Sequence, residues 1–81
     1  MDRLPVDSSS IRSLGYDFPS SILEVELAGS GRVYRYFDVP LSIYDEFMAA
    51  ESKGGYFNEM IRDMYAFEEI EEPMIEGGRG D

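Results

Sequence analysis

The chain has 81 residues and contains neither cysteine nor histidine. The lack of cysteine excludes disulfides, a thiol nucleophile and cysteine-based zinc sites, and the lack of histidine removes the usual general base and the commonest metal ligand. The longest apolar runs, residues 47–50 and 64–67, have four residues each, whereas a membrane helix needs about 20. We therefore expect a protein that is no enzyme, uses no cofactor or metal and does not enter a membrane.

Positive charge is also scarce, because 7 Lys and Arg residues stand against 17 Asp and Glu, for a formal net charge of -10. Hydrophobic residues make up 43% of the chain and aromatic residues 14%, which is the composition of a folded globule. A chain of this length makes one small domain. Residues 1–5 show no secretory signal pattern, so we expect a cytoplasmic protein.

The acidic residues are densest at the C-terminal end. Residues 66–81 hold six acidic side chains against Arg79 alone, together with Pro73 and three glycines, and show no sustained hydrophobic period. This pattern predicts a flexible acidic tail that follows a folded domain of residues 1–65. Such tails commonly do no more than maintain solubility, and the alternative is an interaction segment.

The first half of the domain has the pattern of strands. Residues 10–17 predict a short strand, and residues 22–27 alternate cleanly between apolar and acidic side chains. Residues 28–31 supply a hairpin loop, and residues 32–39 a third strand rich in branched and aromatic side chains. We therefore expect an antiparallel β-meander of three strands.

Two helices follow Pro40, which ends the third strand. Ser42 is a candidate N-cap of the first helix, on which Phe47 lies on the apolar face. The second helix follows residues 52–55, and its apolar residues are spaced for one face, namely Phe57, Met60, Ile61, Met64 and Tyr65. The predicted fold is thus α+β, with a three-stranded antiparallel β-meander followed by two helices packed on one face.

An ordered set of short motifs runs through residues 6–65. It comprises Val6, Ser8-Ser9, Ile11, Gly15-Tyr16-Asp17, Leu23-x-Val25, Tyr34-Arg35-Tyr36, Val39-Pro40, Ala50, Ser52-Lys53-Gly54, Tyr56-Phe57-Asn58, Ile61-Arg62 and Tyr65. In order and spacing this set resembles the KTSC domain family, a small module named for its occurrence at the C-terminus of some lysyl-tRNA synthetases. The resemblance implies a stand-alone bacterial or phage member of the family, and an RNA-binding role has been suggested for such domains.

Tyr34, Arg35 and Tyr36 are the first candidate ligand-binding residues. The two tyrosines are two apart on a predicted strand, so both rings project from one face, as the stacking aromatics of RNA-binding sheets do. The alternative is that this face is buried under the helices, which would leave Arg35 on the outside.

The corner before the second helix holds the next candidates. Lys53 and Gly54 combine an ammonium with backbone amides at a helix start, an arrangement that suits phosphate or carboxylate, although a simple glycine-containing corner is the alternative. Asn58 and Arg62 lie four residues apart on the face expected to be exposed and would extend such a site, unless they are only solvated surface.

Two functions remain open at this stage. The first is a non-catalytic binding module for RNA or another phosphate-bearing ligand, which the net charge of -10 opposes at long range. The second is an acidic protein-interaction factor, for example a phage or mobile-element inhibitor that occupies a basic surface of a host nucleic-acid enzyme. Because like charges repel, we expect a monomer in either case.

Overall fold

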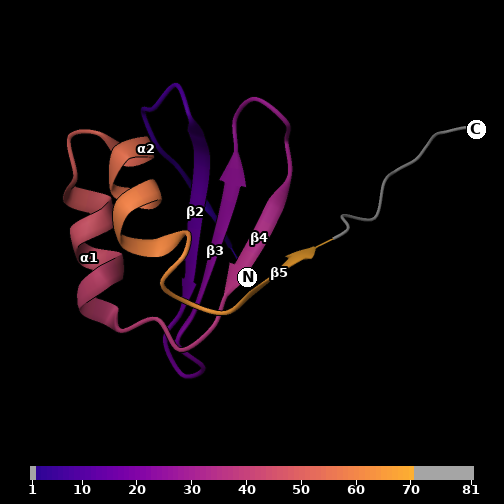
Figure 1. Cartoon of the computed structure of the whole chain (residues 1–81), viewed down its shortest axis with the longest axis vertical. Helices are drawn as coiled ribbons and strands as arrows, with labels where there is room; N and C mark the ends of the chain where they lie inside the picture. The colour runs from indigo at the N-terminus through magenta and orange to yellow at the C-terminus, as the bar shows by residue number, and fades with distance from the viewer. Residues whose placement is uncertain (1, 71–81) are drawn as a thin grey trace, which may run out of the picture.

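The computed structural model describes residues 2–70. These residues form one antiparallel sheet of five strands in the order β1-β2-β3-β4-β5, with the helices on one face (Figure 1). In chain order the elements are β1 (Leu4–Pro5), β2 (Ile11–Asp17), β3 (Ile22–Leu27), β4 (Val33–Tyr36), α1 (Leu41–Ala49), α2 (Lys53–Tyr56), η1 (Phe57–Ile61) and β5 (Phe67–Ile70). The expected α+β class is confirmed, and the meander β2-β3-β4 is extended by one strand at each side.

The core lies between the meander and the helices. In the register, Leu14 faces Val25 and Leu23 faces Tyr36, so these side chains point to the same side of the sheet. From the helices, Phe47 of α1 and Ile61 of η1 are fully buried against them. The alternation in residues 22–27 therefore decides which face of the sheet receives the helices.

Strand β5 lies in the segment for which the sequence predicted a flexible tail from residue 66. It pairs with β4, so that Phe67 is opposite Tyr36, and the Phe67 ring packs on the Tyr36 ring at a centroid distance of 5.2 Å. A backbone bond from Phe37 N to Ala66 O of 2.9 Å leads the chain into this pairing. The sheet thus extends to Ile70, and the rest of the predicted tail, residues 71–81, lies outside the described residues.

The first helix begins two residues earlier than the sequence indicated, because its N-cap is residue 40 and not residue 42. The prediction of Ser42 as N-cap is wrong, because the cap position is Pro40, which makes no side-chain bond. The Pro40 carbonyl accepts from the backbone N–H groups of Ile43 at 3.0 Å and Tyr44 at 3.4 Å. The fixed φ of proline suits this position, so the helix starts without a polar cap.

The second helix buries a narrower face than its spacing predicted. Phe57 and Ile61 are buried, but Met60 is 41% exposed and Met64 is 65% exposed, so the prediction that both methionines dock on the sheet is wrong. The cause is the wide turn η1, in which Arg62 N donates to Phe57 O, five residues back, at 2.8 Å. This wider spacing rotates residue 60 away from the sheet, and the helix ends before residue 64.

The helices of this small domain are short. Among residues 2–70 none is long and apolar enough to cross a membrane.

Candidate functional site

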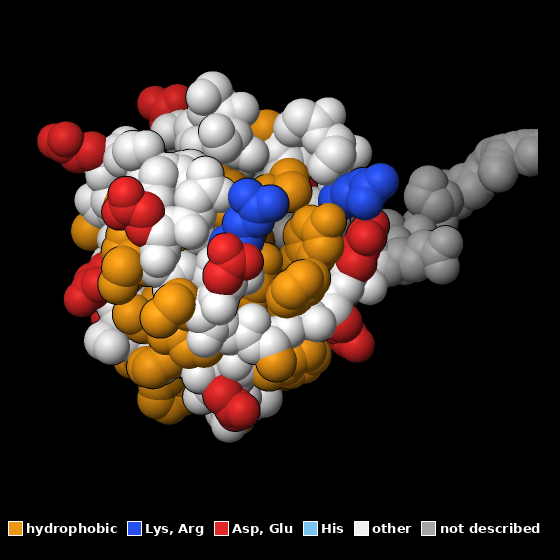
Figure 2. Space-filling view, viewed as in Figure 1, with side chains coloured by type: hydrophobic (Ala, Val, Ile, Leu, Met, Phe, Trp, Pro, Cys, Tyr) orange, Lys and Arg blue, Asp and Glu red, His pale blue; other side chains and the backbone are white. Residues whose placement is uncertain are grey.

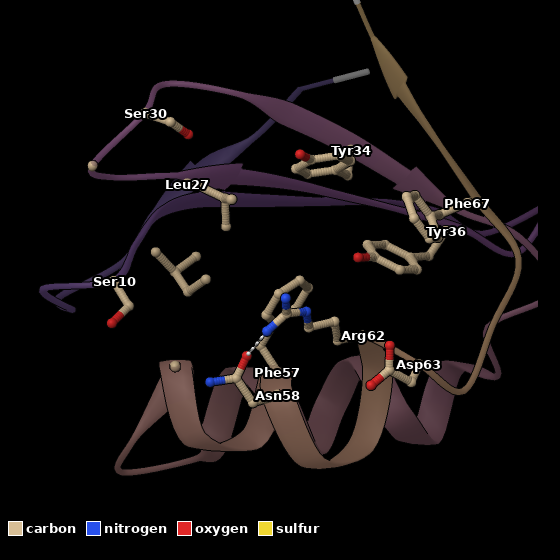
Figure 3. Close-up of a pocket in the computed structure, with 13 residues that line it drawn as sticks. Ser10, Leu27, Ser30, Tyr34, Tyr36, Phe57, Asn58, Arg62, Asp63 and Phe67 are labelled. Atoms are coloured by element: carbon tan, nitrogen blue, oxygen red, sulfur yellow. Dashed lines mark hydrogen bonds between the residues drawn. The ribbon is translucent and has the colours of Figure 1, made fainter.

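A groove of about 590 Å³ opens between the sheet and the second helix (Figure 3). One wall comes from the loop after β3, from β4 and from β5, and the other from α2 and η1. In Figure 2, hydrophobic side chains are exposed over this part of the surface, with basic and acidic side chains among them. Helix α1 lies on the same side of the sheet, and its Tyr44 ring stacks on Tyr16 of β2 at 5.0 Å, away from the residues that line the groove.

Aromatic rings form the wall on the sheet side. Tyr34 and Tyr36 are two apart on β4, and β5 adds Phe67, whose ring meets Tyr34 edge-on at 5.7 Å and Tyr36 at 5.2 Å. Across the groove, Phe57 meets Tyr36 edge-on at 5.7 Å. Such aromatic contacts fix the rings in place, so the wall is formed before any ligand arrives.

The rim on the helix side is polar. Asn58, Arg62 and Asp63 line it, and Figure 3 shows the Arg62 side chain extending from the helix across Phe57 into the groove. Arg62 Nη1 donates to Asn58 Oδ1 at 3.5 Å, which is a long contact. Because Phe57 and Ile61 anchor the turn, the residues that follow each of them, Asn58 and Arg62, point along the groove.

Both candidate tyrosines lie on the face that the helices cover, and not on an open stacking surface. Tyr36 is 2% exposed and belongs to the core, whereas Tyr34 is half-buried at its edge. Burial raises the pKa of Tyr36 to about 12, because the phenolate would lose its hydration. Its hydroxyl, which Figure 3 shows pointing into the groove, is therefore protonated at neutral pH and able to donate a hydrogen bond.

Arg32 lies beside the strand wall, where it interacts with Tyr34 and with Glu69. Its guanidinium is 3.7 Å from the Glu69 carboxylate, and a hydrogen bond with Tyr34, followed by the charge of Glu69, raises the pKa of Arg32. Among the described residues that line the groove, Arg62 is the one cationic side chain and Asp63 the one anionic side chain.

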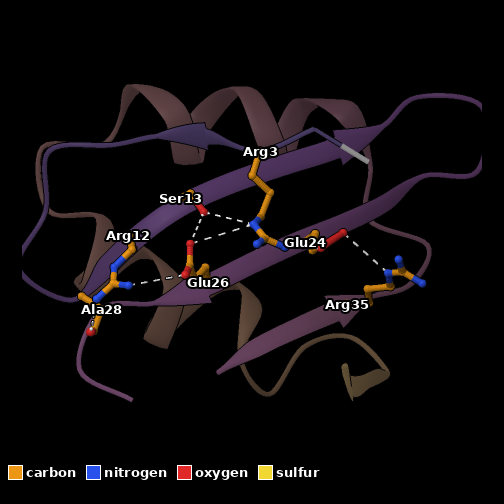
Figure 4. Close-up of polar contacts among 7 residues, drawn as sticks. All are labelled: Arg3, Arg12, Ser13, Glu24, Glu26, Ala28 and Arg35. Carbon is orange, nitrogen blue, oxygen red and sulfur yellow. Dashed lines mark hydrogen bonds and ion pairs between the residues drawn. The ribbon is translucent and has the colours of Figure 1, made fainter. Parts of the chain in front are cut away.

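Arg35, the third strand candidate, points to the opposite face of the sheet and does not line the groove. There its Nε lies 3.6 Å from Oε1 of Glu24, which is 4% exposed. Figure 4 shows the network around it, in which Arg3 contacts Glu24 and donates to Ser13 Oγ at 3.1 Å. The sequence alone grouped Arg35 with residues that the fold separates from it.

The corner residues are used within the fold. Lys53 Nζ donates to the Ala50 carbonyl at 2.7 Å, and the Ser52 hydroxyl caps α2 by accepting from Gly55 N at 3.1 Å. A Cβ at Gly54 would lie 2.8 Å from Ser10 Oγ, so glycine lets α2 approach the start of β2. Gly54 lines one end of the groove, whereas Lys53 does not.

Five of the seven candidate residues therefore meet in one groove, namely Tyr34, Tyr36, Gly54, Asn58 and Arg62. The sequence analysis missed Phe57, assigned only to packing, and Phe67, assigned to the tail. The sequence did contain a signal for strand β5, since Phe67 and Ile70 are apolar residues within the acidic run of residues 67–72. Within residues 2–70, no group of three acidic side chains is placed to hold a metal ion.

These features define a small α+β module with an aromatic groove at the open edge of its helical layer. The KTSC domain family model matches residues 7–65, and the chain belongs to this family. A crystal structure of a KTSC domain protein from Yersinia pestis superposes with a TM-score of 0.83 at 37% identity, over 86% of this chain and 97% of that one.

Two kinds of relatives share the domain. A protein of Stutzerimonas stutzeri, described as uncharacterised, is 43% identical over 65 residues, which are 80% of this chain and 90% of the relative. A lysine–tRNA ligase of Nostoc punctiforme is 36% identical over 67 residues, which are 83% of this chain but 12% of the ligase. The domain thus occurs both in short proteins and as a small part of a synthetase.

Proposed function

We propose that the protein is a non-catalytic, cytoplasmic binding module for single-stranded RNA, and that the groove is its binding site. The observation that carries this proposal is the convergence of three aromatic side chains, Tyr34, Tyr36 and Phe67, with Arg62 and Asn58 in one groove. Proteins bind unpaired RNA by stacking bases on aromatic rings and guanidinium planes. The occurrence of the domain in lysine–tRNA ligases is consistent with such a ligand.

The chemistry of the groove favours binding over catalysis. A chain without histidine or cysteine needs a carboxylate, lysine or tyrosine as its base. Tyr36 has a pKa of about 12 and holds its proton at neutral pH, and Lys53 does not line the groove. Among its described lining residues the groove holds one carboxylate, Asp63, which follows Arg62 in the chain. The groove thus offers aromatic contacts and hydrogen bonds, and we assign it no proton-transfer step.

The net charge of -10 must be reconciled with a ligand that carries phosphates. Long-range repulsion lowers the rate of encounter, but salt screens charges that are more than about 10 Å apart at 0.1 M. Base stacking on aromatic side chains contributes about 1–3 kcal/mol per base and is little affected by screening. Binding of modest affinity that does not collapse at physiological salt is the expected result.

The test is a titration of the full chain with tRNA and with short single-stranded RNA at low and at physiological salt. We expect binding of the single strand, weakened in Arg62→Gln. The matched control is Arg12→Gln, which removes the same charge from an arginine that is 58% exposed on the opposite face. Undetectable binding at both salt concentrations, or equal loss in the two variants, would contradict the proposal.

The charge itself supports a second candidate, an acidic interaction factor that binds a basic protein surface, such as an inhibitor of a host nucleic-acid enzyme. Truncation after Ile70 separates the two, because it removes four acidic residues but keeps β5. Binding to a basic protein should weaken after this truncation, whereas RNA binding should stay the same or improve. The expected monomer can be checked on the same samples by their sedimentation.

A further inference from the structure

The groove combines an apolar interior with a rim of nearly balanced charge. Ile11, Leu27, Tyr36 and Phe57 line its interior, and its volume of about 590 Å³ is within the range of sites that hold small organic ligands. The ring of Tyr36 stands edge-on to Phe57, and Tyr34 and Phe67 continue this wall toward β5. A flat, apolar-faced ring fits such a wall better than a hydrated phosphate does.

The charges at the rim support the same conclusion. Arg62 and Asp63 are adjacent in the chain and both line the groove, so their charges largely cancel at a distance. Arg32 is held by Glu69, and the chain as a whole carries -10. A run of phosphates would therefore be repelled from the groove, whereas a neutral ring would not.

The rim on the helix side offers donors from Asn58 and Arg62 and acceptors from the Asp63 carboxylate. Asn58 directs its carbonyl oxygen to Arg62, which leaves the Asn58 amide nitrogen and the other guanidinium N–H groups to face a ligand. Figure 3 shows the two side chains rising from successive turns of the helix wall and meeting in front of Phe57. Adenine and guanine share an acceptor, N7, that pyrimidines lack, and asparagine and arginine are the side chains that usually contact it.

We propose that the groove receives one unpaired nucleobase, a purine in preference to a pyrimidine, while the strand's phosphates remain outside. This inference rests on the proposed function and specifies how the same site is used. Tyr34 and Phe67 stand edge-on to each other, so the base stacks on one of the two rings and meets the other at its edge. Arg62 and Asn58 contact the edge of the base, and at most one phosphate reaches Arg62. Affinity then comes from stacking, and its dependence on salt is weak.

The first experiment titrates the isotopically labelled full chain with AMP, GMP, CMP, UMP and ribose 5-phosphate, followed by amide resonances in NMR. We expect AMP and GMP to shift the resonances of residues 54–63 and 67, with dissociation constants about five- to tenfold below those of CMP and UMP. Ribose 5-phosphate should cause no comparable shift. Equal binding of all five compounds would show a phosphate site and overturn the inference.

The second experiment compares variants. Phe67→Leu keeps an apolar side chain but removes the ring, and should weaken AMP binding about fivefold to tenfold. Its matched control is Phe18→Leu, which removes a ring that is 67% exposed and does not line the groove. The amide spectrum confirms that each variant is folded. Loss of AMP binding to the same extent in both variants, or in neither, would contradict the inference.

The salt dependence of oligoadenylate binding separates this inference from the function on which it rests. The logarithm of affinity should fall with the logarithm of salt with a slope near -0.7, the value for about one phosphate contact on a single strand. A slope steeper than about -2 with intact binding would leave RNA binding standing and overturn the insertion of a base. No binding of any oligonucleotide, with AMP also failing to bind, would overturn both.

Discussion

The two faces of the sheet are buried by different means. On one face the helices cover Leu23, Val25 and Tyr36. On the other face arginine side chains surround Glu24, which lies between Leu23 and Val25 in the chain. Glu24 is 4% exposed, with Arg3 on one side and Arg35 on the other. The covered face excludes water by packing apolar groups, whereas on the open face Glu24 is buried among arginine side chains that remain partly in water. The helices are thus needed for one face only.

The two faces also differ in what remains for a ligand. On the open face, Arg12 and Arg3 contact Glu26 and Arg35 contacts Glu24, so the cations already lie against carboxylates (Figure 4). The Arg35–Glu24 contact is an ion pair without a hydrogen bond, because neither Arg35 Nε nor Glu24 Oε1 has a hydrogen-bond partner among the described residues. On the covered face, the short second helix leaves aromatic rings and Arg62 at the edge of the core. A groove therefore forms where packing is incomplete, and not where charge is concentrated.

The largest effect should come from the helix contact of the covered face. Ile61→Ala should lower the free energy of unfolding by about 2–5 kcal/mol, because Ile61 is fully buried and its loss leaves a cavity. Met64→Ala is the control, since Met64 is 65% exposed, and should change stability by no more than about 0.5 kcal/mol. Urea denaturation of both variants measures this difference, and similar losses would mean that the helix docks through another face.

The second-largest effect is the dependence of the free energy of unfolding on pH, which Tyr36 of the covered face should cause. The pKa of Tyr36 is about 12 in the folded protein and near 10 in the unfolded chain. A raised pKa gives stability that is complete below pH 10 and is lost as the pH rises toward 12, because the unfolded chain releases the proton first. We expect a loss of about 2 kcal/mol over this interval, below the full linkage value because the hydroxyl faces the groove.

Tyr36→Phe isolates this contribution. The variant should show a flatter dependence of unfolding free energy on pH between 10 and 12, while its stability at pH 7 changes little. Tyr56, whose pKa burial and Glu46 also raise to about 12, remains in the variant and continues to titrate. An unchanged alkaline profile would show that the Tyr36 phenolate is solvated in the folded protein.

The open face should respond less strongly. Glu24→Gln keeps the shape of the side chain but removes the charge that Arg3 and Arg35 share, and should cost about 1–2 kcal/mol, as expected for a hydrogen bond with a charged group. Arg3 and Arg35 retain access to water, with side chains 21% and 38% exposed, so the cost stays below that of breaking a fully buried pair. A thermal shift as large as that of Ile61→Ala would mean that both faces stabilise the fold equally.

The same contrast explains how much could be predicted from the sequence. Alternation in residues 22–27 and the spacing of Phe57 and Ile61 identified the meander, the helical layer and the α+β fold, because these patterns are local. The wide turn η1, which exposes Met60, leaves no periodic signal. The pairing of β5 depends on contacts with distant residues, and its signal is limited to Phe67 and Ile70 in an acidic segment. For the same reason, Tyr34, Tyr36, Asn58 and Arg62 were found as candidates, but their meeting in a groove closed by Phe67 was not.

The smallest effect tests how closely the helix approaches the sheet. In Gly54→Ala the new Cβ would lie 2.8 Å from Ser10 Oγ and 2.9 Å from Ser10 Cβ, an overlap that costs about 1–3 kcal/mol. Alanine in place of glycine favours a helix by about 1 kcal/mol, so the net loss should be about 1 kcal/mol.

Ser10→Gly removes the atoms that a Cβ at residue 54 would meet, and so reverses the sign of the effect. In that background Gly54→Ala should stabilise the protein by about 0.5–1 kcal/mol, because the helix preference of alanine remains and the overlap is gone. The four chemical denaturation curves of this double-mutant cycle measure the coupling directly. If Gly54→Ala costs the same with and without the Ser10 side chain, the contact between residues 54 and 10 does not determine the distance between α2 and the sheet. The width of the groove at Gly54 would then depend on other contacts of the covered face.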